Sequence, residues 1–372
     1  MHSNFSPVLR KLVQIRNERA IHSETVDTAL GQAKGWLQAF ENGHRELALP
    51  ALASILHFYG TDFAKFFADI PLDLAGITPV ESMTIADDKD GILLSFLHGA
   101  HEATVRIPGA NSEQADELQK GFRTDLKLFS KSEAVATLML NAVKMWPKAN
   151  PSDLWLFFVH HSYLNRSLHP GAANADLEQS WKRTGGWALE NVFVKHYNPF
   201  LERFGVSLEM PKKSETLRLL LGAGVKSHSA AEKADVLMLG QRQGRKVPFG
   251  VAHVKASFAE RRTDDEPLSR ELMDLGLASV LLTMDAKAMP SANPVNKGEL
   301  GDSDSNGSKR LDIEREGMFQ ACFSYNSRTV PTREGASVAA RIETLDLSDP
   351  DDRFSSFVVA AFENFLSAES RR

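Results

Sequence analysis

The chain has 372 residues, 42% of them hydrophobic, which is enough to bury more than one core, so we expect at least two domains. Its 43 basic and 48 acidic residues give a net charge of −5, which excludes a protein that binds polyanions through a uniformly basic surface. One cysteine, Cys322, excludes an internal disulfide and a multi-cysteine zinc site, and no segment approaches the ~18 apolar residues of a membrane helix. We expect a soluble, cytoplasmic protein with no membrane contact.

Residues 1–70 are predicted to form a small helical domain. Apolar residues recur at helical spacing, Ser23 is a suitable N-cap, and Gly31 breaks the pattern before a third helix over about residues 33–41. Asn42-Gly43 ends that helix. The order helix, glycine turn, helix indicates a helix-turn-helix, although the apolar positions alone would suit any helical bundle.

The same segment has two arginines in its first helix, Arg16 and Arg19, and the sequence Glu41-Asn42-Gly43-His44-Arg45 at the end of its third. In this combination it resembles the Cro/repressor-type (XRE-like) helix-turn-helix. The resemblance implies that the third helix enters the major groove of DNA. The side chains expected to contact bases or phosphates are Gln32, Lys34, Gln38 and Arg45.

Residues 71–130 are predicted to contain a small β-meander and a linker helix. Apolar residues alternate between Ser82 and Pro108 around the turns DDKDG and HGA, and the amphipathic stretch SEQADELQKGFRTDLKLF follows. A helical region is then expected up to about residue 221. Its tryptophans are expected in the core or in a dimer interface: Trp146, Trp155, Trp181 and Trp187.

Residues 131–372 are predicted to form a catalytic α/β domain with a helical subdomain. From Ser214 the expected elements are helix SETLRLLLGAG, strand ADVLMLG, turn QRQGRK, strand VPFGVAHVKASF, helix PLSRELMDLGL opened by Pro267, and buried strand ASVLLTM. This order resembles the minimal PD-(D/E)xK restriction-endonuclease-like core. The expected fold class is therefore α/β, a mixed central sheet flanked by helices, plus the N-terminal all-α helix-turn-helix domain.

Three side chains of this domain are expected to meet at one edge of the sheet. Asp235 lies at the head of the first strand, Lys255 lies on the second, and Glu271 lies on the helix that follows. His253 shares a strand face with Lys255 and stands where the PD-(D/E)xK motif has an acid. Because Mg²⁺ prefers carboxylate oxygen to imidazole, we expect Glu271 to replace that acid. The predicted Mg²⁺ ligands are Asp235 and Glu271, with Glu215 a weaker candidate, and Lys255 is expected to orient the attacking water.

Other acidic residues receive a structural interpretation. The run Asp264-Asp265-Glu266 lies just before the predicted helix, where acidic groups are stabilised by the positive helix N-terminus. Asp285 and Lys287 follow a buried strand and are expected to form a structural ion pair. Neither group is assigned to the metal site.

The stretch VKASFAERRTDDEPLSRELMDLGLASVLLTMDAK resembles type II restriction endonucleases of the BsaWI kind, within the CCGG-recognising group, and the similarity covers about residues 130–330. The resemblance implies a catalytic acid relocated onto the helix and an acid–arginine pair that recognises C·G pairs. Glu260-Arg261 stands in that place, and Arg262 adjoins it. The glutamate can accept from cytosine N4, and the arginine can donate to guanine O6 and N7. Ala259 stands where some members have another arginine.

The resemblance further implies Mg²⁺-dependent hydrolysis of double-stranded DNA at a palindromic CCGG-containing site, within a restriction–modification system. Cutting a palindrome on both strands requires two-fold symmetry, so we expect a homodimer or a higher homo-oligomer. Two alternatives remain open. One is a helix-turn-helix transcriptional regulator with an inactive nuclease-like domain, and the other is an endonuclease that depends on modified DNA.

Overall fold

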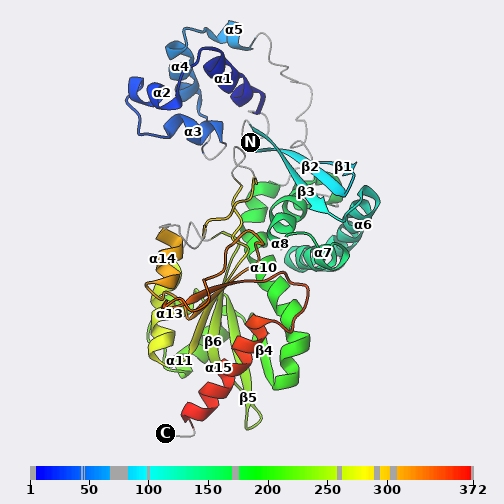
Figure 1. The fold of residues 1–372 in the computed structure, drawn as a ribbon, viewed down its shortest axis with the longest axis vertical. Helices are drawn as coiled ribbons and strands as arrows, with labels where there is room; N and C mark the ends of the chain where they lie inside the picture. The colour runs from blue at the N-terminus through cyan, green and yellow to red at the C-terminus, as the bar shows by residue number, and fades with distance from the viewer. Residues whose placement is uncertain are drawn as a thin grey trace.

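The structure is a computed structural model that describes residues 6–42, 45, 47–67, 83–98, 101–169, 176–257, 262–288, 294–301 and 308–369. A group of N-terminal helices lies at one end, a small sheet and a helical layer follow, and a larger sheet lies towards the other end (Figure 1). Among the described helices, none is both long and apolar enough to cross a lipid bilayer.

The N-terminal helices have a hydrophobic core of their own. They are α1 (Ser6–Glu18), α2 (Ser23–Ala29), α3 (Trp36–Glu41), α4 (Leu49–Phe58) and α5 (Phe63–Phe67). The Arg16 guanidinium donates to both oxygens of the buried Glu41 carboxylate, at 2.7 and 2.9 Å. This bidentate pair joins α1 to the end of α3.

Helix α3 begins at Trp36, three residues later than the sequence indicates. Gly35 adopts a left-handed conformation with φ of 86°, which interrupts a helix started earlier. The buried Asp27 carboxylate accepts from the N–H groups of Gly35 and Leu37, both at 2.8 Å. The acid on α2 therefore fixes both the turn and the start of α3.

A three-stranded antiparallel sheet follows where the sequence alternates. Its strands are β1 (Thr84–Asp88), β2 (Gly91–His98) and β3 (His101–Pro108). The next two helices are α6 (Ser112–Leu128) and α7 (Lys131–Met145). Each begins with a capping box, formed by Asn111 with Gln114 and by Ser130 with Glu133, which satisfies N–H groups that have no partner inside the helix.

A helical layer packs beneath these elements. It consists of α8 (Pro151–Asp153), the π-helical turn η2 (Leu154–Val159), α9 (His160–Leu164), η3 (Arg166–Leu168), α10 (Leu177–Leu201) and η4 (Glu202–Phe204). Helix α10 has 25 residues and packs against both α7 and the central sheet, so it carries side chains from the helical layer to the sheet edge.

The central sheet is mixed, as the sequence predicts. Its order is β4 (Val206–Glu209), β5 (Val236–Arg242), β6 (Arg245–Lys255), β7 (Ala278–Thr283), β8 (Ala321–Ser324) and β9 (Arg341–Thr344). Strands β4, β5 and β6 are antiparallel, whereas β6 to β9 run parallel. The β6–α13–β7 connection is therefore a parallel crossover.

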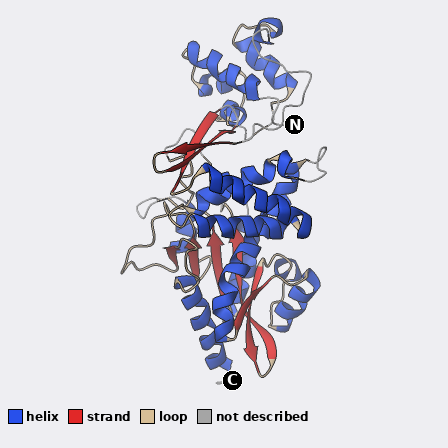
Figure 2. Cartoon of the chain, turned by 90° about the vertical axis from the view of Figure 1, so that its right-hand side faces the viewer, coloured by secondary structure: helices blue, strands red, loops and turns tan. Residues whose placement is uncertain are grey.

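Helices cover both faces of this sheet (Figure 2). They are α11 (Lys213–Gly222), α12 (His228–Ala231), α13 (Arg262–Asp274), α14 (Ser308–Glu314) and α15 (Arg353–Glu369). Alternate β5 residues face opposite ways: Val236 and Met238 pack in the core that includes α10 and α15, and Leu237 and Leu239 pack with α11 and α13. The α/β fold class, with helices on both sides of a mixed sheet, is confirmed.

Helix α13 begins at Arg262, not at Pro267 as predicted, and Pro267 lies inside it. Asp265 thus belongs to the first turn of α13, where a carboxylate is stabilised by the helix dipole. The earlier start changes which acid of this helix lies closest to the end of β6.

Candidate active site

Asp235, Lys255 and Asp265 converge from three elements. Because β5 and β6 are antiparallel, the residue that precedes β5 lies beside the end of β6. The Lys255 ammonium lies 2.7 Å from Asp235 Oδ2 and 3.1 Å from Asp265 Oδ2, in the first turn of α13. Asp235 Oδ2 also accepts from the Val254 N–H at 2.9 Å. The lysine therefore bridges two carboxylates at one edge of the sheet.

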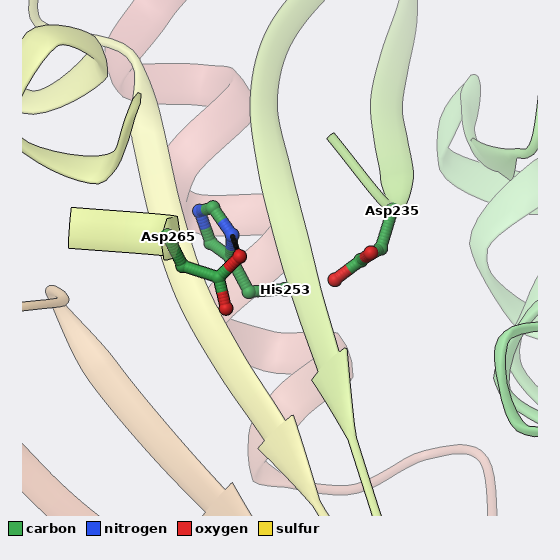
Figure 3. A group of neighbouring side chains, drawn as sticks. All are labelled: Asp235, His253 and Asp265. Carbon is green, nitrogen blue, oxygen red and sulfur yellow. Dashed lines mark ion pairs between the residues drawn. The ribbon is translucent and has the colours of Figure 1, made fainter. Parts of the chain in front are cut away.

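His253 lies beside this group and is completely buried. Its Nδ1 is 3.8 Å from Asp265 Oδ1, which is too long for a hydrogen bond. Neither ring nitrogen has a hydrogen-bond partner in the part of the chain that the structure describes. Ligand atoms of Asp235, His253 and Asp265 all lie within 4.8 Å of one another, and Figure 3 shows the Asp235 carboxylate pointing towards the other two. These residues can share one cation.

The charges of this group stabilise one another. Burial by itself would lower the pKa of Lys255, but the Asp235 and Asp265 carboxylates hold that pKa above its usual value. Burial by itself would raise the pKa of Asp265, but His253 and Lys255 lower it below its usual value. The lysine is therefore cationic and Asp265 anionic at neutral pH.

Glu190 brings a further carboxylate from α10. It lines an open pocket of about 650 Å³ together with Asp235, Lys255 and Asp265. Burial raises the pKa of Glu190 to about 8; the negative charge of Asp235 adds to the shift, and Lys255 opposes it. The raised pKa means that a negative charge on Glu190 is unfavourable in this pocket. A cation bound there would stabilise the ionised carboxylate.

Glu271, predicted to share a cation with Asp235, is engaged elsewhere. Its carboxylate accepts from the N–H of Lys226 at 2.5 Å and of Ser227 at 3.4 Å, at the start of α12. Asp265 and Glu271 are six residues apart on α13, which places them about 120° apart around the helix. The structure thus brings Asp265, not Glu271, beside Lys255. The physical reason for the difference is the earlier start of α13.

Glu215, the other predicted metal ligand, is not part of this group. Glu215 is exposed on α11, and its carboxylate lies 3.7 Å from the Arg218 guanidinium. Its neighbours Lys213 and Thr216 line the pocket, whereas Glu215 is not among the lining residues. The predicted base-contacting residues Glu260 and Arg261 lie outside the described residues. Arg262 opens α13, and its side chain is likewise outside the description.

The four predicted DNA contacts of the N-terminal helices are all exposed. Gln38 is on α3, whereas Gln32 and Lys34 lie in the turn before it. The Lys34 ammonium is 2.9 Å from the Glu24 carboxylate at the surface. The Arg45 guanidinium lies 5.3 Å from the centre of the Phe40 ring. Their exposure leaves them accessible to a ligand, and their role in DNA binding stays a prediction.

A buried carboxylate fixes the chain just after Lys255. Glu299 accepts from Ser257 Oγ at 2.8 Å, from Lys287 Nζ at 2.9 Å and from Lys309 Nζ at 2.5 Å. Lys287 is thus paired with Glu299, not with Asp285 as the sequence suggests. Asp285 accepts instead from the N–H of Glu299 at 2.6 Å and from Thr329 Oγ1 at 2.8 Å. This network ties the exits of β6 and β7 together.

Sequence reasoning missed Asp265 and Glu190. Asp265 has a recognisable signal, because an acid ten residues after the lysine falls in the first turn of the next helix once that helix starts at Arg262. Glu190 has no local signal. Its contribution depends on α10 packing along the sheet, and helical periodicity does not specify that packing.

Comparison with known proteins supplies the family. The chain is 36% identical over 268 residues to the type II restriction enzyme AgeI of Thalassovita gelatinovora, a match that covers 69% of this chain and 95% of that enzyme. The structure of a specific AgeI–DNA complex superposes with a TM-score of 0.66 and 34% identity, covering 72% of this chain and 99% of the other. No protein-family model matches.

A second solved structure, a pre-specific BsaWI–DNA complex, has 15% identity and a TM-score of 0.36, over 68% of this chain and 93% of that chain. Neither this identity nor this TM-score supports a closer relationship to BsaWI, so the BsaWI-like, CCGG-recognising assignment stays a prediction.

Proposed function

The chain belongs to the type II restriction enzymes and is a deoxyribonuclease, and from this premise we propose that it hydrolyses double-stranded DNA in a Mg²⁺-dependent reaction at a palindromic CCGG-containing site. The observation that carries the proposal is the position of Lys255 between two carboxylates in an open pocket. A scissile phosphate placed there meets one cationic and several acidic side chains, which are the groups that metal-assisted phosphodiester hydrolysis requires.

The donor set fits a hard divalent cation. Asp235 and Asp265 offer carboxylate oxygens close enough to share one ion, and Glu190 adds another carboxyl group to the same pocket. His253, with both ring nitrogens lacking hydrogen bonds, is a poorer ligand for Mg²⁺ and lies where it can contact Asp265. We assign the cation to Asp235 and Asp265, with Glu190 assisting. When bound, such a cation supplies positive charge that stabilises the developing charge on the phosphate.

Lys255 has two roles in this proposal. Its ammonium orients the attacking water and holds a non-bridging oxygen of the scissile phosphate. Because its pKa is raised by the two aspartates, it remains charged throughout the neutral pH range. Its side chain is 15% exposed, so the charge acts at the pocket surface with little competition from solvent.

Sequence selection is assigned to the segment that joins β6 to α13. Glu260 accepts from cytosine N4, Arg261 donates to guanine O6 and N7, and Arg262 assists. Two copies of the chain related by a two-fold axis place two catalytic groups on the two strands of a palindrome, so the active form is a homodimer or a higher homo-oligomer.

The N-terminal helices are proposed to be a second DNA-binding unit of the helix-turn-helix type. Gln38 on α3 faces solvent, and Gln32, Lys34 and Arg45 are exposed near the same helix. Their proposed ligand is DNA that flanks the cut site, a second site, or the promoter of the enzyme itself. Loss of these contacts would weaken binding without relaxing the cut-site sequence.

Run-off sequencing of digested DNA tests the proposed reaction, since it yields activity, target and cut stagger together. The proposal predicts cleavage of unmethylated plasmid with Mg²⁺, none with a chelator, and none for Lys255→Ala. Stable band shifts without cleavage under any divalent metal would favour a regulator with an inactive nuclease-like domain. Cleavage only after methylation would favour an endonuclease that depends on modified DNA.

A further inference from the structure

Trp187 is exposed, so it is not the core residue that the sequence offers as one option, and its dimer-interface option stays a prediction. Its side chain is 54% exposed, whereas Trp146, which ends α7, and Trp155, in the helical layer, are 1% and 3% exposed. All five tryptophans lie in the described part of the chain, and Trp187 alone among them is exposed. An indole ring offers a large apolar surface and a single N–H donor, so one left in solvent marks a surface that a ligand can cover.

The position of Trp187 connects it to the catalytic group. It lies three residues before Glu190 on α10, so both side chains project from one face of that helix. Trp187 and Glu190 line the same pocket as Asp235 and Lys255. Three helical residues correspond to a rise of about 4.5 Å. The indole and the Glu190 carboxyl group therefore lie on neighbouring turns of α10, at the wall of one pocket.

We propose that Trp187 contacts the substrate, packing its ring against the deoxyribose and base edge of the nucleotide next to the scissile phosphate. The proposal rests on the proposed nuclease function, because it takes the scissile phosphate to lie against Lys255. With the phosphate there, the neighbouring nucleotide passes the indole. Met210 and Pro211 also line this pocket and add apolar surface that the strand can contact.

DNA suits this surface better than a second protein chain does. A protein partner that covered Trp187 would also cover Glu190, one turn away, and would close the pocket over Asp235 and Lys255. A substrate strand covers the indole only while it occupies the active site. The deoxyribose is the same at every nucleotide, so a ring that packs mainly against it positions the strand and does not select its sequence.

Tryptophan fluorescence measures this contact directly. The wild-type enzyme is titrated, with Ca²⁺ in place of Mg²⁺, with a short duplex that contains the sequence the enzyme cuts. We expect a saturable change in emission for the wild type and loss of most of that change in Trp187→Phe, while circular dichroism stays the same. An equally large change in Trp187→Phe would overturn the proposal. So would a wild-type emission spectrum that shifts with protein concentration in the absence of DNA if that shift is lost in Trp187→Phe.

Cleavage kinetics provide the second measurement. Trp187→Ala is expected to raise KM by about tenfold, with kcat within about threefold of wild type and with partial recovery in Trp187→Phe. Phe204→Ala is the matched control, because Phe204 is 49% exposed just beyond α10 and does not line the pocket. Its KM is expected to equal that of wild type. An unchanged KM in Trp187→Ala contradicts the inference alone, whereas a wild-type enzyme that cuts no DNA contradicts the proposed function and the inference with it.

Discussion

Replacing the two candidate acids of α13 one at a time separates their roles. Asp265→Asn keeps the shape of the side chain and removes a charge 3.1 Å from Lys255. At an effective dielectric constant of about 20, that pair attracts by roughly 5 kcal/mol before desolvation is counted. The proposed cation loses one of two carboxylates as well. Removing one such electrostatic group from an active site lowers kcat by about 10²–10³-fold, and we expect at least that loss here.

Glu271→Ala is expected to act on stability instead. The carboxylate holds two N–H groups at the start of α12, one of them at 3.4 Å, so its removal costs about 1–2 kcal/mol and lowers Tm by a few degrees. The assay is single-turnover cleavage with enzyme in excess at saturating Mg²⁺, paired with thermal unfolding. Activity of folded Glu271→Ala is expected within about tenfold of wild type. A folded but inactive Glu271→Ala together with an active Asp265→Asn would refute the assignment of Asp265.

Three further outcomes are expected. Glu299→Gln leaves two lysines without their buried counterion and should lower the free energy of unfolding by about 2 kcal/mol in denaturant titrations, whereas the exposed Glu334→Gln should change it little. Burial lowers the pKa of His196 to about 4 against opposing effects of nearby aspartates, so the unfolded state binds more protons between pH 6.5 and 4. The free energy of unfolding should therefore decrease as the pH is lowered from 6.5 to 4, by up to about 3 kcal/mol from this group. A difference in unfolding free energy between wild type and His196→Gln that does not change with pH would contradict this prediction. Arg261→Ala should cost about 1–3 kcal/mol of discrimination at a C·G pair, measured as relative cleavage rates on matched and mismatched duplexes; unchanged specificity would remove this residue from base recognition.

The order of elements in the catalytic region could be predicted because it is written in local patterns. Alternation and apolar runs indicate β5, β6 and β7, and the hairpin between β5 and β6 follows from Gln243-Gly244, both of which have positive φ. Antiparallel pairing then places Asp235 beside Lys255. The proximity of these two site residues could therefore be predicted from the pairing of β5 with β6 alone.

The positions of the other site residues depend on where α13 begins and on how α10 packs, and the local sequence pattern specifies neither. Proline is favoured in the first turn of a helix, which makes Pro267 look like a start, yet the acidic run before it extends α13 back to Arg262. The added residues bring Asp265 beside Lys255, whereas Glu271, about 120° around the helix, binds N–H groups at the start of α12. Glu190 is contributed by a helix that packs across the fold, and its part in the site could be found only once that packing was known.

In the proposed mechanism, Asp265 and Asp235 together hold the catalytic cation beside Lys255. The most direct measurement is a crystal structure of the enzyme with its cleaved sequence and Mn²⁺, in which anomalous scattering locates the ion. We expect an ion with carboxylate oxygens of both aspartates at about 2.0–2.4 Å and the scissile phosphate next to Lys255. An ion coordinated by Glu271 in place of Asp265 would contradict it.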